Sequence, residues 1–502
     1  MLAPINCQLS QWSEWTECFP CQGKKYRHRT VLQPSKYGGR RCTGSLWDQM
    51  ECVPTGTCAV SQDCGNDFRC EESGRCIKHH LVCNGEADCR DESDEVNCED
   101  VESSCDYVDP IPGVARLAQG YNILTQQGAQ LVYDIAYYGG QCESVYNGEW
   151  RELKYDATCE HLYYGDDEKY FRRPYNVHYY QFLAYADTGF SSEYYDDAKD
   201  LLNAIKKDTS WNVGITVGIS PAESPVSLEA GFRLSQGRGT LRNITEYQSK
   251  NLGFIRVRTK VQTARFKMRR TDIVLDEDMF QSLMDLPDQY NYGMYSQFIN
   301  TYGTHFMTSG TMGGVFEYIL VINIDKMHKA ELTKDSVSSC FGASMGIDIS
   351  FQEAKVKPSL SFDHCSKDAS RGFESTSANS AIEDIIPRVQ GGDTASIGRL
   401  MEGSSVNAYR YWGRSLKLNP AVIDFELMSI DEIVRRTNLQ HLEAKRKNLK
   451  RALDEYMTEF NACRCGPCRN NGEPMMVGAT CICDCEKGAQ GPACENTMQE
   501  GK

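Results

Sequence analysis

The chain has 502 residues with 24 cysteines, and its 54 Lys and Arg against 69 Asp and Glu give a formal net charge of −15. This length exceeds one ordinary core and predicts several domains. The acidic balance excludes nucleic acid as a partner, because phosphates need a basic surface, and it gives no long-range attraction to anionic lipid. Any action on a membrane must therefore use apolar surface, after a partner protein has delivered the chain.

The cysteines indicate a secreted protein. The sequence has no run of 18 or more apolar residues, which predicts no membrane-spanning helix, and residues 1–6 lack the apolar core of a signal peptide. Most cysteines lie in dense clusters at the two ends of the chain. Small secreted modules have this pattern, whereas cytosolic proteins rarely do. We expect a mature secreted protein whose leader has been removed.

The N-terminal block, residues 1–60, combines aromatic, basic and cysteine residues. Trp12 and Trp15 precede the run Tyr26–Arg29, and guanidinium groups stacked on indole rings can stabilise a module with little core. Together with six cysteines, these residues resemble a thrombospondin type 1 repeat. The resemblance implies C-mannosylation of Trp12 and Trp15, and the disulfides Cys7–Cys42, Cys18–Cys21 and Cys52–Cys58. A purely structural spacer is the alternative interpretation.

The second block, residues 61–100, contains six cysteines and a dense run of short acidic side chains. Carboxylates this close repel one another unless a cation lies among them, and Ca²⁺ takes six to eight oxygen ligands. The block resembles an LDL-receptor class A repeat, which implies the disulfides Cys64–Cys76, Cys70–Cys89 and Cys83–Cys98. It also implies a structural calcium ion held by Leu81, Asn84, Glu86, Asp88, Asp94 and Glu95. Leu81 and Glu86 would use backbone carbonyls, and Asn84 replaces the family's usual Asp. A solvated acidic loop is the alternative.

The last block, residues 463–498, resembles an EGF-like module, with a turn at Asn470–Gly472. The resemblance implies the disulfides Cys465–Cys481, Cys468–Cys483 and Cys485–Cys494, and it leaves Cys463 over. Residues 101–462 between the modules, here called the central domain, contain few cysteines and mixed helix and strand patterns. Apolar residues at helical spacing predict an amphipathic helix at its end, capped by Thr437 or Asn438, with a solvated face at Lys445–Lys447, Lys450 and Arg451.

Two stretches of the central domain alternate strictly between apolar and polar or small residues, each as two segments of about ten residues joined by a polar turn. Such segments suit tilted transmembrane strands, and one hairpin alone would leave its edge groups unpaired in lipid, so several subunits must close a barrel. The alternative is an ordinary half-buried hairpin, which has the same period. The apolar positions of the first stretch are Val213, Ile215, Val217, Ile219, Val226, Leu228, Ala230, Phe232 and Leu234. Those of the second are Phe341, Ala343, Met345, Ile347, Ile349, Phe351, Ala354, Val356, Leu360 and Phe362.

The run Tyr302-Gly303-Thr304-His305 resembles the signature of the membrane-attack-complex/perforin family, and Gly391-Gly392 matches that family's glycine pair at a sheet bend. The resemblance implies an α+β fold, a bent and twisted antiparallel sheet flanked by two helical clusters. These clusters, about residues 193–255 and 325–390, would unfurl into the two transmembrane hairpins. Residues 193–207 fit this, because they have a helical pattern yet run into a strand pattern. His305 is interpreted as structural rather than as a general base, because no nucleophile accompanies it.

The order of modules resembles the terminal complement proteins of that family. Beyond the modules, the pairs Cys105–Cys142 and Cys340–Cys365 leave Cys159 and Cys463. Cys159 lies in what resembles an insertion that holds a small lipocalin-type gamma chain, so an interchain disulfide is expected there, with a Cys159–Cys463 pair or a free thiol as alternatives. Relatives continue into a second thrombospondin repeat, in which Cys463 would find its partner. Asn243 begins a sequon for N-glycosylation beyond the first hairpin.

The resemblance therefore implies a non-enzymatic, secreted pore-forming subunit that inserts into a target cell membrane. Its expected partners are the gamma chain, a beta chain, complement components five b, six, seven and nine, and membrane lipid. It would template the addition of component nine. The rival hypothesis is a secreted adhesion or receptor-ligand protein that uses the small modules for protein binding. The alternating hairpins and the signature distinguish the two, since an adhesion protein needs neither.

Overall fold

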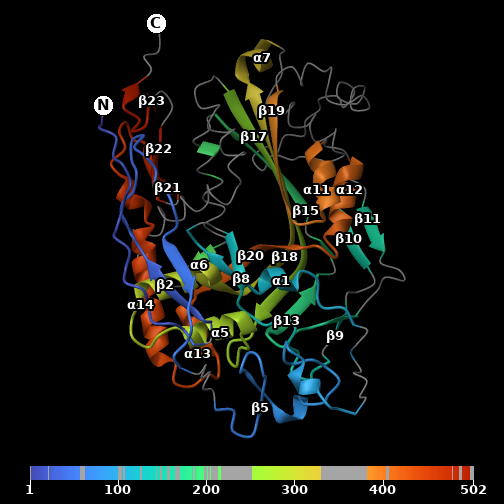
Figure 1. Cartoon of the computed structure of the whole chain (residues 1–502). Coiled ribbons are helices and arrows are strands. Elements are labelled where there is room, and N and C mark those ends of the chain that lie inside the picture. The colour runs from blue at the N-terminus through green and yellow to red at the C-terminus, as the bar shows by residue number, and fades with distance from the viewer. Residues whose placement is uncertain are drawn as a thin grey trace.

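The computed structural model places three small modules around a central α+β domain (Figure 1). The described residues are 2–20, 22–56, 63–99, 105, 108–124, 127–142, 144–146, 150–154, 159–163, 170–183, 185–186, 188–196, 200–201, 204, 213–215, 252–329, 382–402, 406–477, 479–485 and 489–497.

The N-terminal module is a small set of strands stabilised by stacked aromatic and basic side chains. Strand β1 (Gln8–Leu9) pairs with β3 (Val31–Gln33), and β2 (Lys24–His28) pairs with β4 (Trp47–Glu51). Arg27 lies between two indole rings, 4.8 Å from the ring centre of Trp12 and 4.6 Å from that of Trp15. Arg29 and Lys25 extend the stack at its two ends. Cation–π contacts thus replace much of the missing apolar core, as the sequence predicts.

Two of the expected disulfides in this module are wrong. Cys18 is bonded to Cys52 across 5.9 Å between Cα atoms, so neither Cys18–Cys21 nor Cys52–Cys58 can form. The reason is the pairing of β2 with β4, in which Lys24 lies opposite Glu51 and the Cys52 amide donates to the Gly23 carbonyl. This pairing carries Cys52 back to the start of the module beside Cys18. The third expected pair, Cys7–Cys42, is present.

The class A module, residues 61–100, has little regular structure and is held by its disulfides. Its elements are β5 (Phe68–Arg69), β6 (Cys76–Ile77) and the 3-10 turns η1 (His79–Leu81) and η2 (Ser93–Glu95). The structure contains all three expected disulfides, Cys64–Cys76, Cys70–Cys89 and Cys83–Cys98. Its small core includes Tyr137 of the central domain, so the module does not pack on itself alone.

The central sheet is built around one long antiparallel pair, β17 (Leu252–Met268) and β18 (His305–Asn323). The lower ends of the pair bind β13 (Val177–Phe182) and β20 (Ala421–Ser429). The upper ends bind β15 (Thr188–Tyr195) and β19 (Ile382–Gln390). At the lower end, β7 (Gln119–Asn122) joins β18 and β8 (Gln127–Leu131), while β16 (Val213–Ile215) runs parallel to β20.

Helices cover both halves of this sheet. The lower core lies among α1 (Val114–Leu117), α5 (Glu277–Asp285), α6 (Tyr292–Tyr302), α13 (Asp431–Arg436) and α14 (Glu443–Glu459). The upper half packs against α11 (Thr394–Glu402) and α12 (Val406–Ser415), where Trp412 and Tyr409 meet Phe316 (Figure 1). Helix α7 (Ile324–Lys329) follows the upper end of β18.

The sheet changes partners at a group of glycines, where β18 passes from β20 to β19. Gly391 and Gly392 follow β19 directly and have φ angles of 82° and 93°, in the left-handed region that favours glycine. A Cβ on Gly391 would lie 2.6 Å from the carbonyl oxygen of Gly313, and one on Gly392 would lie 2.7 Å from the Trp412 ring. The positive φ angles and the lack of room for a Cβ thus both explain why glycines occupy this bend, as the sequence-based interpretation expects.

The helix at the end of the central domain starts later than expected. Helix α14 begins at Glu443 with no side-chain cap, and Thr437 instead ends α13, donating its hydroxyl to the Val434 carbonyl. The prediction that Lys445 is solvated is also wrong, because its ammonium reaches the carbonyls of Leu283 and Met284. The expected apolar face is otherwise present, with Leu449, Leu453 and Tyr456 buried.

Strands occupy the described ends of the two expected helical clusters, and most of both clusters lies outside the described residues. Glu193–Tyr195 belong to strand β15, and the described helical residues are 200, 201 and 204 in the first cluster and those of α7 in the second. Residues 382–390 form strand β19 rather than part of the second cluster. Pairing of β19 with β18 buries Ile386 against Phe254 and Leu201, which outweighs any local preference for a helix.

Smaller sheets complete the chain. Strands β9 (Ser144–Tyr146) and β12 (Tyr170–Arg172) pair, and β10 (Trp150–Lys154) pairs with β11 (Cys159–Tyr163) and β14 (Tyr185–Ala186). The EGF-like module contains η4 (Ala462–Cys465), β21 (Glu473–Val477), β22 (Thr480–Asp484), β23 (Ala489–Gln490) and β24 (Asn496–Thr497). This module contains its three expected disulfides, Cys465–Cys481, Cys468–Cys483 and Cys485–Cys494. The expected Cys105–Cys142 pair of the central domain is also present.

The glycine bend gives a direct test. We expect Gly391→Ala to lower the free energy of unfolding by at least about 2 kcal/mol, because the new Cβ must share space with the Gly313 carbonyl at a positive φ. Gly398→Ala is the matched control, since Gly398 lies inside helix α11 and a Cβ added there would meet no described atom within 4 Å. It should stabilise the chain by about 0.5–1 kcal/mol. Thermal unfolding of both variants measures the contrast, and equal shifts in midpoint would contradict the role assigned to Gly391.

Candidate functional site

The family signature forms the junction between helix α6 and strand β18. Gly303 ends α6 with a φ of 90°, and a Cβ there would lie 2.7 Å from the Tyr121 backbone nitrogen. The Thr304 hydroxyl donates to the Tyr121 carbonyl at 3.1 Å and accepts from the Ile123 amide at 3.0 Å. The Thr304 carbonyl accepts from the Ile430 amide. This buried segment therefore fastens β7 and the end of β20 to the start of β18.

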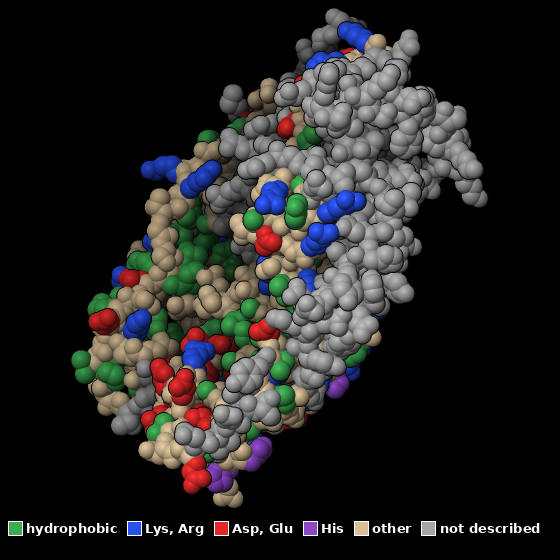
Figure 2. All heavy atoms as spheres, turned by 90° about the vertical axis from the view of Figure 1, so that its right-hand side faces the viewer, with side chains coloured by type: hydrophobic (Ala, Val, Ile, Leu, Met, Phe, Trp, Pro, Cys, Tyr) green, Lys and Arg blue, Asp and Glu red, His purple; other side chains and the backbone are tan. Residues whose placement is uncertain are grey.

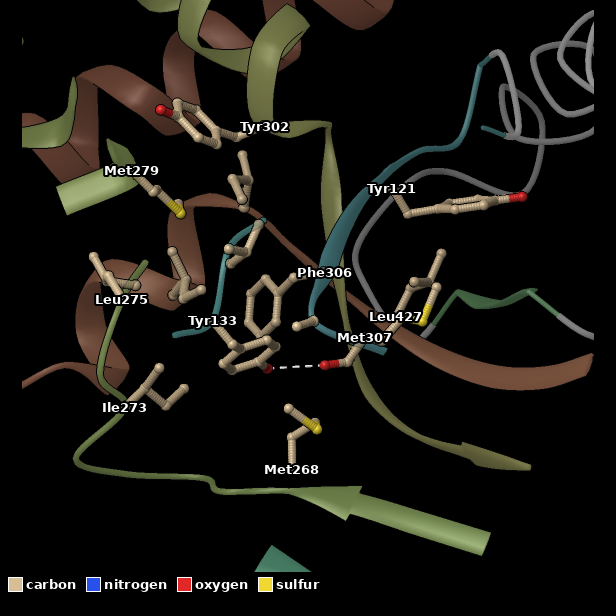
Figure 3. Close-up of a cluster of buried hydrophobic side chains, with 14 of the residues drawn as sticks. Tyr121, Tyr133, Met268, Ile273, Leu275, Met279, Tyr302, Phe306, Met307 and Leu427 are labelled. Carbon is tan, nitrogen blue, oxygen red and sulfur yellow. Dashed lines mark hydrogen bonds between the residues drawn. The ribbon is translucent and has the colours of Figure 1, made fainter. Parts of the chain in front are cut away.

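Large apolar side chains surround this junction (Figure 3). The Tyr133 hydroxyl donates to the Met307 carbonyl at 2.8 Å. The centre of the Tyr133 ring lies 6.0 Å from that of Phe306, in an edge-to-face arrangement. Tyr302 projects from the end of α6, where its hydroxyl is 2.9 Å from that of Ser282. The signature thus organises the core of the lower half.

His305 is buried, with 1% of its surface exposed. Its Nδ1 lies 2.9 Å from the Thr304 hydroxyl, and its Nε2 has no hydrogen-bond partner among the described residues. Burial lowers the pKa of His305 to about 4, because the apolar surroundings disfavour the charged ring. The ring is therefore neutral at physiological pH. These contacts are those of a structural histidine.

The predicted membrane hairpins fall mostly outside the described residues. Only Val213–Ile215 of the first hairpin is described, as edge strand β16, in which Val213 lies opposite Phe425. Residues 216–234 of the first hairpin and 341–362 of the second lie outside the described part of the chain, as does the Cys340–Cys365 pair. What the structure does place are the four strands from which both stretches leave and to which they return.

These four strands are neighbours in the order β15, β17, β18 and β19. The segment that contains the first stretch begins after Tyr195 at the end of β15 and ends at the start of β17, where Tyr195 lies opposite Phe254. The second leaves after β18 and returns at β19, where Ile322 lies opposite Ile382. All four ends lie at the upper end of the sheet (Figure 1). Two hairpins that extended these four strands beyond the sheet would therefore lie side by side.

A buried ion cluster, defined as Arg256, Glu317 and Arg388, ties three of these strands together. Glu317 is completely buried; one carboxylate oxygen accepts from Arg256, and the other lies 2.9 Å from an Arg388 nitrogen. Burial alone would raise the pKa of Glu317, but Arg388 and Arg256 outweigh it and hold that pKa below its usual value. Sequence reasoning missed this cluster, although a lone Glu in the apolar run of β18 was an available signal.

The expected calcium ligands lie together in one loop of the class A module. Asp88 and Asp94 are buried, and Asp94 accepts from the backbone amides of Asp88 and Cys89. Glu95 accepts from the amides of Asn84 and Gly85. Each carboxylate oxygen has a second lone pair, so these contacts are compatible with metal binding.

The loop has the residue types of a cation site, but the side-chain amide of Asn84 directs its nitrogen, and not its oxygen, toward Asp88. Burial, opposed by a hydrogen bond from Asn84, raises the pKa of Asp88 to about 6, with the charges of Asp94 and Glu86 adding to the rise. Excess negative charge of this kind is what a bound Ca²⁺ neutralises. The Asn84 amide nitrogen donates to Asp88 while its oxygen accepts from the Glu86 amide. Within the described residues, three or more Asp, Glu, His or Cys side chains do not form a metal cage. The residue types of the loop suit Ca²⁺, but its described side chains are not grouped around a common centre, so calcium stays a prediction.

Other expected sites have mixed outcomes. Cys159 begins strand β11, opposite Lys154 of β10, which places it in a hairpin of the predicted insertion. Cys463 lies in η4, and Asn243 lies outside the described residues. Trp12 and Trp15 lie in the cation–π stack, and their C-mannosylation stays a prediction. Among described helices, none combines the length and apolar character needed to cross a bilayer.

Comparison with known proteins gives consistent matches along the chain. Residues 110–466 match the MAC/Perforin domain family, and residues 50–98 match the low-density lipoprotein receptor domain class A. Residues 468–496 match the EGF-like domain family of complement components eight alpha, eight beta and six.

Three relatives cover almost all of this chain. It is 54% identical to the Complement component C8 alpha chain of Oryctolagus cuniculus, over 99% of this chain and 86% of that protein. It is 31% identical to the Complement component C8 beta chain of Mus musculus, over 99% of this chain and 82% of that protein. It is also 31% identical to Complement component C6 of Bos taurus, over 99% of this chain and 52% of that protein.

The buried His305 predicts a pH dependence of stability. Its pKa is about 4 in the folded chain and about 6.5 when unfolded, so the unfolded state binds more protons between these values. The stabilisation is complete above pH 6.5 and is lost as pH falls toward 4, by up to about 3 kcal/mol. Denaturant unfolding at a series of pH values should show a shallower decline for His305→Gln than for the unchanged chain. Parallel curves over this range would disprove the assignment.

Proposed function

The chain belongs to the membrane attack complex/perforin family, and on that premise we propose that it is a non-enzymatic, pore-forming subunit of the complement membrane attack complex. It would be secreted, join the assembling terminal complement complex on a target cell, insert two amphipathic β-hairpins and template the addition of component nine. Relatives that are named as complement components match almost the full chain, and they support the assignment of this protein to the complement membrane attack complex.

The observation that carries hairpin insertion is the order of strands at the upper end of the sheet. Both alternating stretches are bounded by adjacent antiparallel strands, β15 with β17 and β18 with β19, and β17 pairs with β18. If each strand simply continued in its own direction, the two stretches would extend the existing sheet as four strands. Each arm has about the ten residues that a tilted transmembrane strand requires.

The edges of the extended sheet explain why an assembly is needed. A four-stranded sheet leaves unpaired N–H and C=O groups on its two outer strands, and these are not tolerated in hydrocarbon. Matching strands from neighbouring subunits would satisfy them. The formal net charge of −15 gives no attraction to anionic lipid, so partner proteins must bring the chain to the membrane.

The proposed partners extend from the component eight beta chain and component six, which the relatives name, to the rest of the proposed assembly. They are the complement component eight beta chain, its gamma chain bound through Cys159, components five b, six, seven and nine, and the lipid of the target membrane. The gamma-chain contact is supported by the position of Cys159 in the β10–β11 hairpin, outside the central sheet.

Hairpin insertion can be tested residue by residue. Single cysteines introduced from Phe341 to Phe351 and labelled with a polarity-sensitive dye should report alternating environments once liposomes and the other terminal complement proteins are added. Positions such as Met345, Ile347 and Ile349 should report lipid, because they share one face of a strand with a period of two. Lipid-borne quenchers should reach these positions and spare Gly346 and Asp348 between them.

The same label at Ser45 of the N-terminal module, which lies outside the central domain, is the control and should show no change. A signal with a helical period, or water at every labelled position, would exclude insertion of this segment. The adhesion hypothesis would then gain support.

The interchain bond has its own test. Cys159→Ser should abolish the covalent adduct with the gamma chain on non-reducing electrophoresis, whereas Cys463→Ser should leave it intact. If the Cys463 variant lost the adduct and the Cys159 variant kept it, the assignment of Cys159 would be wrong.

A further inference from the structure

We propose that calcium binding in the class A module is coupled to docking of that module on the central domain, with Arg172 as the positioning residue. This inference rests on the calcium site predicted from the sequence and goes beyond it. Acidic side chains and histidines gather at the lower end of the molecule, where the class A module lies (Figure 2). The calcium loop, residues 81–95, is one of the parts of this module that central-domain side chains contact.

Arg172 of the central domain reaches directly to the loop. Its guanidinium lies 2.8 Å from the Glu86 carboxylate, and only 8% of the Arg172 side chain is exposed. The guanidinium also stacks on Tyr138 at 3.8 Å and donates to the Gln141 carbonyl at 3.0 Å. These contacts fix its position. Arg172 therefore holds Glu86, whose backbone carbonyl is an expected calcium ligand, from outside the module.

Arg75 makes the reverse connection, from the module to the central domain. Its guanidinium pairs with Asp134 and lies 3.2 Å from Glu277, both in the central domain. A nitrogen of the same group donates to the backbone carbonyl of Asp88, another expected ligand. Its side chain is 7% exposed, so water competes little for these contacts. A shift of Asp88 would disturb the pairing across the interface.

The backbone of the central domain also lies close against the loop. A Cβ on Gly140 would come within 2.9 Å of the Leu81 side chain and 4.0 Å of the Asn84 amide nitrogen. Leu81 packs in one apolar cluster with Tyr137 and Tyr175 of the central domain. The expected ligands Leu81, Asn84, Glu86 and Asp88 thus lie along the interface.

Coupling follows from this shared geometry. A calcium ion orders the loop, and the ordered loop presents Glu86 and Asp88 to their interdomain partners. By thermodynamic reciprocity, a central domain that holds those residues in place must in turn raise the affinity of the loop for calcium. Outer contacts that position ligands change metal affinity by about 10–100-fold when removed.

The test compares Arg172→Ala with Arg90→Ala in the full chain. Calcium affinity is measured by titration calorimetry after removal of metal with a chelator. Arg172→Ala should weaken calcium binding by about tenfold. Arg90 also crosses the interface, to Asp276 and Asp278, but its side chain contacts none of the expected ligands. Arg90→Ala should therefore change the affinity by less than about twofold, since it lacks an outer contact of this kind.

Two further variants keep the test decisive if Arg172→Ala folds poorly. Arg172→Lys keeps the charge but loses the planar contact with Tyr138, and it should show an intermediate loss. Glu86→Gln removes the partner carboxylate while leaving the backbone carbonyl, and combined with Arg172→Ala it should add little further loss. Equal affinities of the Arg172 and Arg90 variants would overturn the coupling. Absence of calcium binding by the unchanged chain would instead overturn the calcium site itself.

Discussion

The antiparallel pairing of β17 with β18 is the constraint on which the rest of the structure depends. It runs from Lys267 opposite Ser309 to Leu252 opposite Asn323, interrupted only by a bulge at Gln262–Ala264. Each other strand that flanks the two alternating stretches is fixed by pairing with one member of this pair. The pair therefore sets the spacing and direction of everything that leaves the upper end of the sheet.

Side chains reinforce the register of this pair in different ways above and below the bend. Above it, Glu317 lies opposite Arg258 and Arg388 and bonds to Arg256, so a shift by one residue would turn a buried carboxylate away from its partners. An isolated buried charge is strongly destabilising, which makes such a shift costly. Below it, the Thr304 hydroxyl and the Tyr133–Met307 hydrogen bond fasten the start of β18. Each half thus adds side-chain contacts of its own to the shared pairing of β17 with β18.

The sequence predicted those features that arise from local chemistry. The cation–π stack follows from the Trp and Arg residues themselves, whereas the class A and EGF-like disulfides and the glycine bend were predicted through the family resemblance that local motifs carry. It failed where distant contacts decide. Cys18 pairs with Cys52 because β2 and β4 meet, and Lys445 is buried because the last turn of α5 offers it two carbonyls. The ion cluster was missed for the same reason, since its three members come from three strands.

The positions of the small modules bear on where the central domain can change shape. Glu459 at the end of α14 accepts from the Val31 amide and the Tyr292 hydroxyl, which joins the N-terminal module to α14 and α6. Arg464 donates to the Val31 and Leu32 carbonyls and adds the start of the EGF-like module to the same joint. Arg75 and Arg90 fasten the class A module to the residues around α5. Each of these attachments braces the lower half of the domain. Under the proposed function, extension of the two stretches from the upper ends of β15, β17, β18 and β19 would leave these attachments in place, although Val213–Ile215 would first have to separate from β20.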